Sequence, residues 1–233
     1  MIALKSVPYN GWDKEYVELM KDPYVRKKYN RERRIQDKQA YIKKYLPEIN
    51  SSMRVLDLGP GPGEFLEVCR KMGCEIHGID APIGQSEMGD EYIRLCKLMS
   101  DRQKLNIKYI GVDKMLEANG KFPYSDCFFD VINSQGSIEQ IFKNRMDGVP
   151  CRVHKNCNLL SWIIDTRTKE LFLLFFEEIN RILKHDGICF IYANGAKNVS
   201  AYNDMVFESV KKVNGLYVIN SLDNRIHKIG KTK

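Results

Sequence analysis

Three glycines at alternate positions are the residues of this chain best placed to bind a ligand. Gly59, Gly61 and Gly63 follow the apolar run at residues 55–58 and lead directly into a helix-forming segment that begins at Glu64. Glycine lets the backbone turn sharply and approach a ligand that side chains would exclude. A helix that begins there offers free N–H groups and a partial positive charge. The stretch therefore predicts a ligand site between a strand and a helix.

Two carboxylates flank this loop in a way that suits an adenosine-type cofactor. Asp57 lies at the end of the first apolar run, and Asp80 follows the next β-rich run, residues 75–79. An acid at the end of the second strand is placed to accept hydrogen bonds from a ribose diol. A dinucleotide fingerprint would require its third glycine at position 64, where this chain has Glu64. A pyrophosphate would be poorly tolerated beside that acid, so the spacing argues against a dinucleotide.

Four segments in order resemble the class I S-adenosylmethionine-dependent methyltransferases of the small-molecule type. The first is the acid-x-Gly-x-Gly-x-Gly loop at residues 57–63. The second, FPYSDCFFDVI at residues 122–132, is similar to the family's stretch leading into the fourth strand. The third is SIEQ at residues 137–140, and the fourth is EEINRILKHDGI at residues 177–188, the turn into the fifth strand. The resemblance extends over residues 50–193 and keeps the family's order.

The resemblance implies a cofactor and the residues that hold it. S-adenosyl-L-methionine would be the methyl donor and S-adenosyl-L-homocysteine the product. The first acid and the glycine loop would surround the methionine part, and the acid after the second strand would bind the ribose. Ala81 would flank the adenine, and Asp113, after the third expected strand, would reach the adenine amine. Asn133 and Ser134, at the end of the fourth expected strand, would lie near the sulfonium. The implied residues are Asp57, Gly59, Gly61, Gly63, Asp80, Ala81, Asp113, Asn133 and Ser134.

Two residues are candidates for a general base, which is needed only if the acceptor is a hydroxyl or a protonated amine. Glu139 follows the fourth strand, where an acid would face the pocket or would cap its own helix. His154 lies in the long connection at residues 144–165, which we expect to cover the site as a lid; otherwise it is a solvent-facing loop residue. Gln140 stands where the family often has histidine, so no histidine role is carried over to that position.

A metal site is not expected. Cys151, His154 and Cys157 lie at intervals of three residues, but three ligands do not make a closed zinc site. The nearby sequence offers no second Cys/His pair. Ordinary loop thiols explain these cysteines more simply.

The order of the elements predicts an α/β fold, a Rossmann-like three-layer sandwich. Continuous apolar strands that alternate with helices indicate a mostly parallel sheet covered on both faces. We expect seven strands, the last antiparallel, with residues 1–50 as a helical cap within the same domain as the cofactor-binding residues 51–233. The strands are expected at residues 54–58, 75–79, 107–112, 129–133, 188–193, 216–220 and 225–229, and the main helices at 24–45, 64–72, 88–99, 168–183 and 202–213.

The helical cap is the expected substrate region, because small-molecule members of the family often place their substrate cap there. Arginines in residues 24–34 could clamp a phosphate or carboxylate, and the tyrosines could wall a ring. The alternative is a solvated helix face, since lysine and arginine are good surface helix formers. The candidate substrate-binding residues are Tyr24, Tyr29, Arg33 and Gln135.

Composition and charge limit the kinds of partner that we expect for this chain. The 233 residues carry a formal net charge of +7, of which residues 1–52 contribute +5, residues 225–233 contribute +4 and the rest −2. The basic ends suggest an anionic partner or a solvated surface. No run of about 18 apolar residues could span a bilayer, and the N-terminus has no apolar h-region. We expect a cytoplasmic protein without a membrane span.

Three functions stay open. The first is methylation of a small, anionic or sugar-related metabolite at oxygen or nitrogen. The second is an RNA or protein methyltransferase that docks through its basic ends. Nucleic acid is the less favoured partner, because residues 133–136 read NSQG where amine methylases of nucleic-acid bases carry an Asp/Asn-Pro-Pro-aromatic motif. The third is a partner subunit that binds the cofactor without catalysis.

Overall fold

A computed structural model of the chain describes residues 18, 21, 31–82, 90–118, 120–138, 166–192, 199–222 and 226–232. The expected lid at residues 144–165 lies outside these ranges, as do the residues of the expected cap before Arg31 other than 18 and 21. None of the helices in the described ranges has the length and apolar composition of a membrane span.

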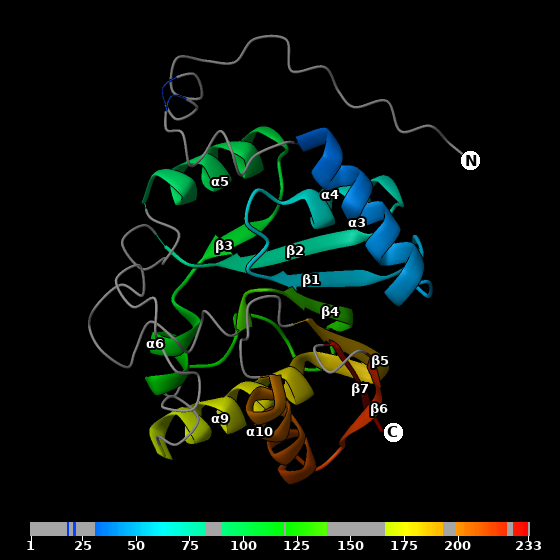
Figure 1. Cartoon of the computed structure of the whole chain (residues 1–233), viewed down its shortest axis with the longest axis vertical. Helices are drawn as coiled ribbons and strands as arrows, with labels where there is room; N and C mark the ends of the chain where they lie inside the picture. Colours follow the sequence, from blue (N-terminus) through cyan, green and yellow to red (C-terminus); the bar gives the residue numbers. More distant parts are fainter. Residues whose placement is uncertain are drawn as a thin grey trace.

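The described strands form a seven-stranded sheet in the order β3-β2-β1-β4-β5-β7-β6 (Figure 1). The first five are parallel to one another, and β7 runs antiparallel to both of its neighbours. The expectation that the last strand is antiparallel is therefore confirmed. The strands are β1 (Arg54–Leu58), β2 (Glu75–Asp80), β3 (Ile107–Tyr109), β4 (Phe129–Gln135), β5 (Leu183–Tyr192), β6 (Leu216–Leu222) and β7 (Ile226–Lys231).

Helices cover both faces of the sheet, which confirms the predicted Rossmann-like three-layer arrangement (Figure 1). One layer holds α3 (Arg31–Tyr45), α4 (Glu64–Lys71) and α5 (Asp90–Arg102). The other holds α6 (Val112–Glu117), α9 (Thr166–Ile182) and α10 (Val199–Lys212). The central strands are buried on both faces: in β1, Val55 packs with α3 and α4, whereas the adjacent Leu56 packs with α9 and α10. This alternation explains why the strands read as continuous apolar runs.

Two expected strands were wrong by three residues or more at one end, and the others agree to within two residues. The strand expected at residues 107–112 ends at Tyr109, and Val112 begins α6, where it is buried in the core. The fifth strand begins at Leu183 rather than at residue 188. Phe129 of β4 pairs with Leu183 and Val131 pairs with Ile188, so residues 184–187 form a bulge. Apolar content alone could not show either feature, because both depend on pairing with a neighbouring strand.

Candidate functional site

The glycine loop joins the carboxyl end of β1 to α4, next to β4, where the strand order reverses. Gly59, Gly61 and Gly63 have φ values of 72°, 56° and 83°, which are strained for residues with a side chain. A Cβ atom on Gly59 would lie 2.3 Å from the Cβ of Ser137, so the loop packs directly against the segment after β4. Glycine is therefore required in this loop both by the backbone conformation and by close packing against neighbouring side chains.

Asp80 ties the glycine loop to the end of β2. Its two carboxylate oxygens accept hydrogen bonds from the backbone N–H of Gly61, at 2.9 Å, and of Ala81, at 2.8 Å. Burial raises the pKa of Asp80 to about 6, although both hydrogen bonds favour the charged form. Each oxygen keeps acceptor capacity for a further donor, such as a hydroxyl of a ligand.

Asp57 lies in a buried polar chain that crosses from the sheet to α3. The side-chain amide of Asn133 donates to Asp57 Oδ1 at 2.7 Å, and the Tyr41 hydroxyl donates to Asn133 Oδ1 at 2.8 Å. Burial raises the pKa of Asp57 to about 7, while the charge of Lys38 and the hydrogen bond from Asn133 act in the opposite direction. A carboxylate whose charge is so poorly compensated is suited to a positively charged ligand.

Glu64, the first residue of α4, is fully buried and lies beside Arg34 of α3. Arg34 Nε is 2.9 Å from Glu64 Oε1. The contact is an ion pair but not a well-aligned hydrogen bond, and among the described residues neither Glu64 oxygen has a hydrogen-bond partner. The Tyr92 hydroxyl of α5 is close by, since a Cβ on Gly61 would lie 3.3 Å from it. Arg34 thus links α3 to the start of α4 beside the glycine loop.

Lys38 brings a second positive charge from α3 to the end of β4. Its ammonium donates a hydrogen bond to the side-chain carbonyl of Gln135. Burial lowers the pKa of Lys38, and the charges of Asp57 and Glu64 oppose that effect. Arg34, Lys38 and Tyr41 are spaced at i, i+4 and i+7, which places them on one face of the helix. That face of α3 packs beside the glycine loop and the end of β4.

The structure gathers most of the sequence-predicted residues at the carboxyl ends of β1, β2 and β4. Arg33 instead is exposed, and its neighbour Arg34 reaches the buried carboxylate, because adjacent helical residues point about 100° apart. Asp113 lies in the first turn of α6, with its side chain outside the described set. Tyr24, Tyr29, Glu139 and His154 lie outside the described residues. The residues brought together are Asp57, Gly59, Gly61, Gly63, Asp80, Ala81, Asn133, Ser134 and Gln135.

Sequence reasoning missed three contributors to this site: Lys38, Tyr41 and Ser137. Lys38 and Tyr41 could have been identified from their spacing, which places them on the same helix face as Arg34. Ser137 belongs to the SIEQ segment, but its role could not be predicted, because its hydrogen bonds with the backbone carbonyl of Leu58 and with the Ser134 hydroxyl depend on how β1 and β4 are paired.

Comparison with protein families gives one match over most of the chain. A family model described as a methyltransferase domain matches residues 29–193. No curated protein matches the chain.

Several solved structures are similar to this chain. A chain of the complex between the Haloferax volcanii Trm112 methyltransferase activator and a methyltransferase is 15% identical, with 96% of this chain and 99% of that chain covered and a TM-score of 0.52. An S-adenosyl-L-methionine-dependent methyltransferase of Methanococcus maripaludis is 15% identical, with 96% and 97% covered and a TM-score of 0.50. A methyltransferase of the same kind from Archaeoglobus fulgidus is 21% identical, with a TM-score of 0.42. The match covers 84% of this chain and 64% of that chain, so this chain spans less than two thirds of that protein.

Proposed function

The chain belongs to the methyltransferase-domain family, the class I S-adenosylmethionine-dependent enzymes, and we propose that it transfers a methyl group from S-adenosyl-L-methionine to oxygen or nitrogen of a small, anionic or sugar-related metabolite. The observation that carries the donor half is the glycine loop held by Asp80 at the carboxyl end of β2. The acceptor half is supported by Lys38, which faces the end of β4.

The residues of the site fit this cofactor. Both Asp80 oxygens retain lone pairs for the two ribose hydroxyls after accepting their backbone hydrogen bonds. Asp57, buried and poorly compensated, suits the positively charged methionine part that would lie along the glycine backbone. The remaining assignments follow the family: Ala81 beside the adenine, Asp113 toward its amine, and Asn133 and Ser134 near the sulfonium.

The bound cofactor supplies a methyl group that a positively charged sulfur has already activated. The protein therefore has to align the acceptor with that methyl group and to exclude water. Tyr41, Asn133 and Ser134 are buried around the end of β4, where they would exclude water from one side of the site. A hydroxyl acceptor must also lose its proton, and Glu139 and His154 stay our candidates for the base that takes it.

Lys38 is the described cation best suited to an anionic acceptor. The charge of Arg34 is balanced at short range by Glu64. The hydrogen-bond partner of Lys38, in contrast, is the neutral amide of Gln135. An ammonium in a partly buried setting attracts an anion more strongly than one in water, because the effective dielectric constant is lower. A phosphate or carboxylate bound there would sit beside the end of β4.

Calorimetric titration of the full chain with S-adenosyl-L-methionine tests the core of this proposal. We expect saturable binding that Asp80→Ala weakens strongly, because the ribose loses its acceptor and the loop loses its tie to β2. Asp101→Ala removes an exposed acid on α5 and is the matched control, for which we expect the wild-type affinity. Absence of saturable binding, or equal affinity for both variants, would show that this site does not hold the cofactor.

A further inference from the structure

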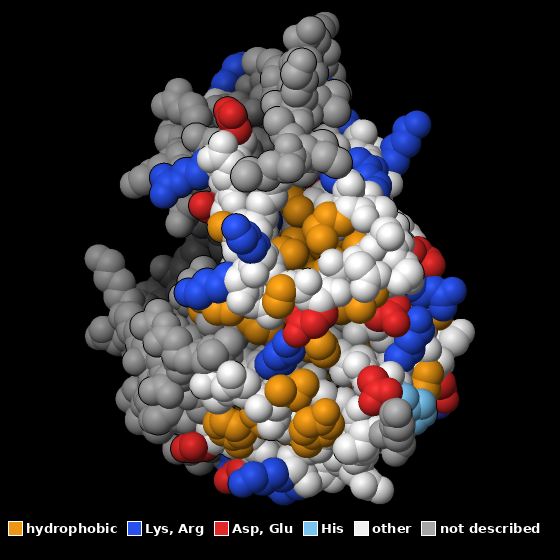
Figure 2. All heavy atoms as spheres, turned by 90° about the vertical axis from the view of Figure 1, so that its right-hand side faces the viewer, with side chains coloured by type: hydrophobic (Ala, Val, Ile, Leu, Met, Phe, Trp, Pro, Cys, Tyr) orange, Lys and Arg blue, Asp and Glu red, His pale blue; other side chains and the backbone are white. Residues whose placement is uncertain are grey.

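A second pocket lies toward the opposite, amino ends of the parallel strands. Its volume is about 540 Å³, which is large enough for a small organic molecule. The lining comes from β2, from the start of β3 and from the segment that leads into β4; it includes His77, Lys108, Tyr124 and Phe128. On the side of the molecule shown in Figure 2, toward which these amino ends point, hydrophobic side chains gather among charged ones. The glycine loop is at the other end of the same strands.

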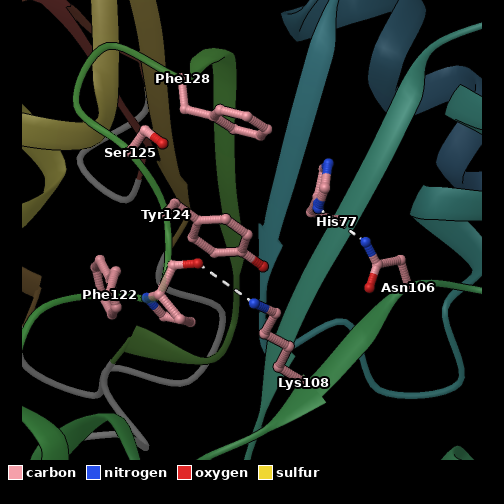
Figure 3. Close-up of a pocket in the computed structure, with 8 residues that line it drawn as sticks. His77, Asn106, Lys108, Phe122, Tyr124, Ser125 and Phe128 are labelled. Carbon is pink, nitrogen blue, oxygen red and sulfur yellow. Dashed lines mark hydrogen bonds between the residues drawn. The ribbon is translucent and has the colours of Figure 1, made fainter.

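The walls of this pocket are aromatic and held in place. Tyr124 and Phe128 are nearly parallel, with their ring centroids 5.9 Å apart and an angle of 21° between the planes. His77 approaches each of them edge-on at 5.4 Å. The imidazole is fixed on both sides, by Glu75 Oε1 at 3.0 Å from Nε2 and by Asn106 Nδ2 at 2.9 Å from Nδ1. Figure 3 shows these rings together with Lys108 around the pocket.

One cation at this pocket is held by a neutral group. The Lys108 ammonium lies 4.8 Å from the centroid of the Tyr124 ring, and its hydrogen bond goes to the backbone carbonyl of Pro123 at a long 3.3 Å (Figure 3). Arg54 also lies over a ring of the pocket, that of Phe128, but it is paired with the Glu75 carboxylate at 2.8 Å. Lys108 therefore supplies the positive charge that a ligand could use.

The Tyr124 hydroxyl is buried and has no hydrogen-bond partner among the described residues. Leaving a buried hydroxyl unpaired is unfavourable, so native structures pair nearly all such groups. Burial raises the pKa of Tyr124 to about 12, which keeps the hydroxyl protonated and able to donate at neutral pH. A donor without a partner next to a cation points to a missing acceptor that is negatively charged.

We infer that this pocket binds a small planar aromatic carboxylate. The ring of such a ligand would pack against Tyr124, Phe128 and His77, and its carboxylate would accept a hydrogen bond from Lys108. The flexible Lys108 side chain, which lies over the Tyr124 ring, would turn toward the carboxylate and so expose the buried Tyr124 hydroxyl as its second donor. A carboxylate attached directly to the ring fits the short distance between the Lys108 ammonium and the Tyr124 ring. A nucleotide, whose phosphate is several bonds away from its base, fits that distance less well.

Benzoate binding to the full chain tests the inference, measured by calorimetry with and without saturating S-adenosyl-L-homocysteine. We expect millimolar affinity that the cofactor product does not change, because the two sites lie at opposite ends of the strands. Lys108→Met should weaken benzoate about tenfold, which corresponds to 1.4 kcal/mol. Lys121→Met, which removes an exposed charge from the same region, should have no effect. Benzyl alcohol, the neutral analogue, should bind more weakly than benzoate.

Tyr124→Phe separates a ligand-binding role from a structural one. The variant removes an unpaired buried hydroxyl, so it should melt at the wild-type temperature or above. On our inference it nevertheless binds benzoate several-fold more weakly. The inference is overturned if benzoate does not bind saturably, if S-adenosyl-L-homocysteine displaces it, or if Lys108→Met and Tyr124→Phe bind it as the wild type does. None of these results bears on the methyltransferase proposal, which rests on the cofactor titration.

Discussion

At the scale of single residues, Asp57 and Asp80 dominate the electrostatics of the cofactor site. Both are acids whose pKa lies well above the ordinary value, at about 7 and about 6, with burial as the main cause. Each is therefore charged only when the pH exceeds its raised pKa. A cationic cofactor binds best to the charged forms, and its binding in turn lowers both pKa values.

The affinity for S-adenosyl-L-methionine should accordingly fall as the pH falls through about 7 to 6. Protonation of Asp57 and Asp80 removes the negative charges that face the methionine part and the ribose. Calorimetric titrations at pH 8 and pH 5.5 measure this effect, and we expect affinity several-fold lower at the acidic pH. In Asp57→Asn the affinity should be lower at pH 8, and the dependence on pH should shrink. An affinity that is constant across this range in the wild type would contradict the assignment.

The second prediction for a single residue is that Lys38 contributes to binding of the methyl acceptor. Lys38→Met should raise the KM for an anionic acceptor about tenfold or more, because a charge-assisted hydrogen bond contributes about 1.5–3 kcal/mol. The KM for S-adenosyl-L-methionine should change less, and should rise near neutral pH, because the charge of Lys38 helps to keep Asp57 ionised. Initial rates with labelled cofactor and a panel of phosphorylated and carboxylated metabolites provide the measurement.

Lys43→Met is the matched control for this experiment, because Lys43 lies on the same helix and is exposed. It removes the same charge without touching the site and should leave both KM values unchanged. If both variants behave alike, the positive charge of α3 acts from a distance and Lys38 does not contact the acceptor.

At the scale of elements, α3 is held to the cofactor end of the sheet by one buried ion pair and by aromatic packing. Arg34 reaches Glu64 at the start of α4, and Tyr41 packs edge-on against Phe65 and Phe190. These contacts support the proposal that residues 1–50 cap the domain that follows them, of which α3 is the part described. The cap is thus tied to the helix whose first turn follows the glycine loop.

Arg34→Met should destabilise the protein by about 3 kcal/mol. Removing one partner of a buried ion pair costs about 3–5 kcal/mol, and the lower end applies because 29% of the Arg34 side chain is exposed whereas Glu64 is fully buried. Urea unfolding measures the change in the free energy of unfolding. Arg33→Met on the exposed side of α3 should change it by less than about 0.5 kcal/mol.

The double variant Arg34→Met/Glu64→Gln tests the cause of that loss. Glutamine removes the uncompensated charge, so the double variant should recover much of the stability that Arg34→Met loses. A double variant as unstable as the single one would mean that the Arg34 guanidinium stabilises the fold through contacts other than the one with Glu64.

At the scale of the whole molecule, the two ends of the parallel strands carry different chemistry. The carboxyl ends gather buried acids and the glycine loop, where the order of strands reverses between β1 and β4, as is usual for ligand sites in such sheets. The amino ends gather the aromatic pocket around Tyr124. The net charge of +7 comes from the two ends of the chain; its N-terminal share includes Arg34 and Lys38 of the first site, whereas the residues of the aromatic pocket lie between the two ends.

Local sequence was enough to predict the family, the order of most elements and the glycine loop. The loop could be recognised because glycine spacing, a preceding strand and a following helix are properties of adjacent residues. The expected strand at residues 54–58 agrees with β1 for the same reason. Local sequence also favoured Asp80 as a ligand, since it ends the second strand.

Only the tertiary structure decided which residues meet across the sheet and across α3. The contact of Asp57 with Asn133 joins residues 76 positions apart, and that of Tyr41 with Asn133 joins residues 92 apart. The burial that raises the pKa of Asp57, the choice of Arg34 over Arg33, and the end of β3 at Tyr109 all follow from packing between distant segments. Composition and periodicity carry no information about such pairings, because they describe neighbours along the chain and not neighbours in space.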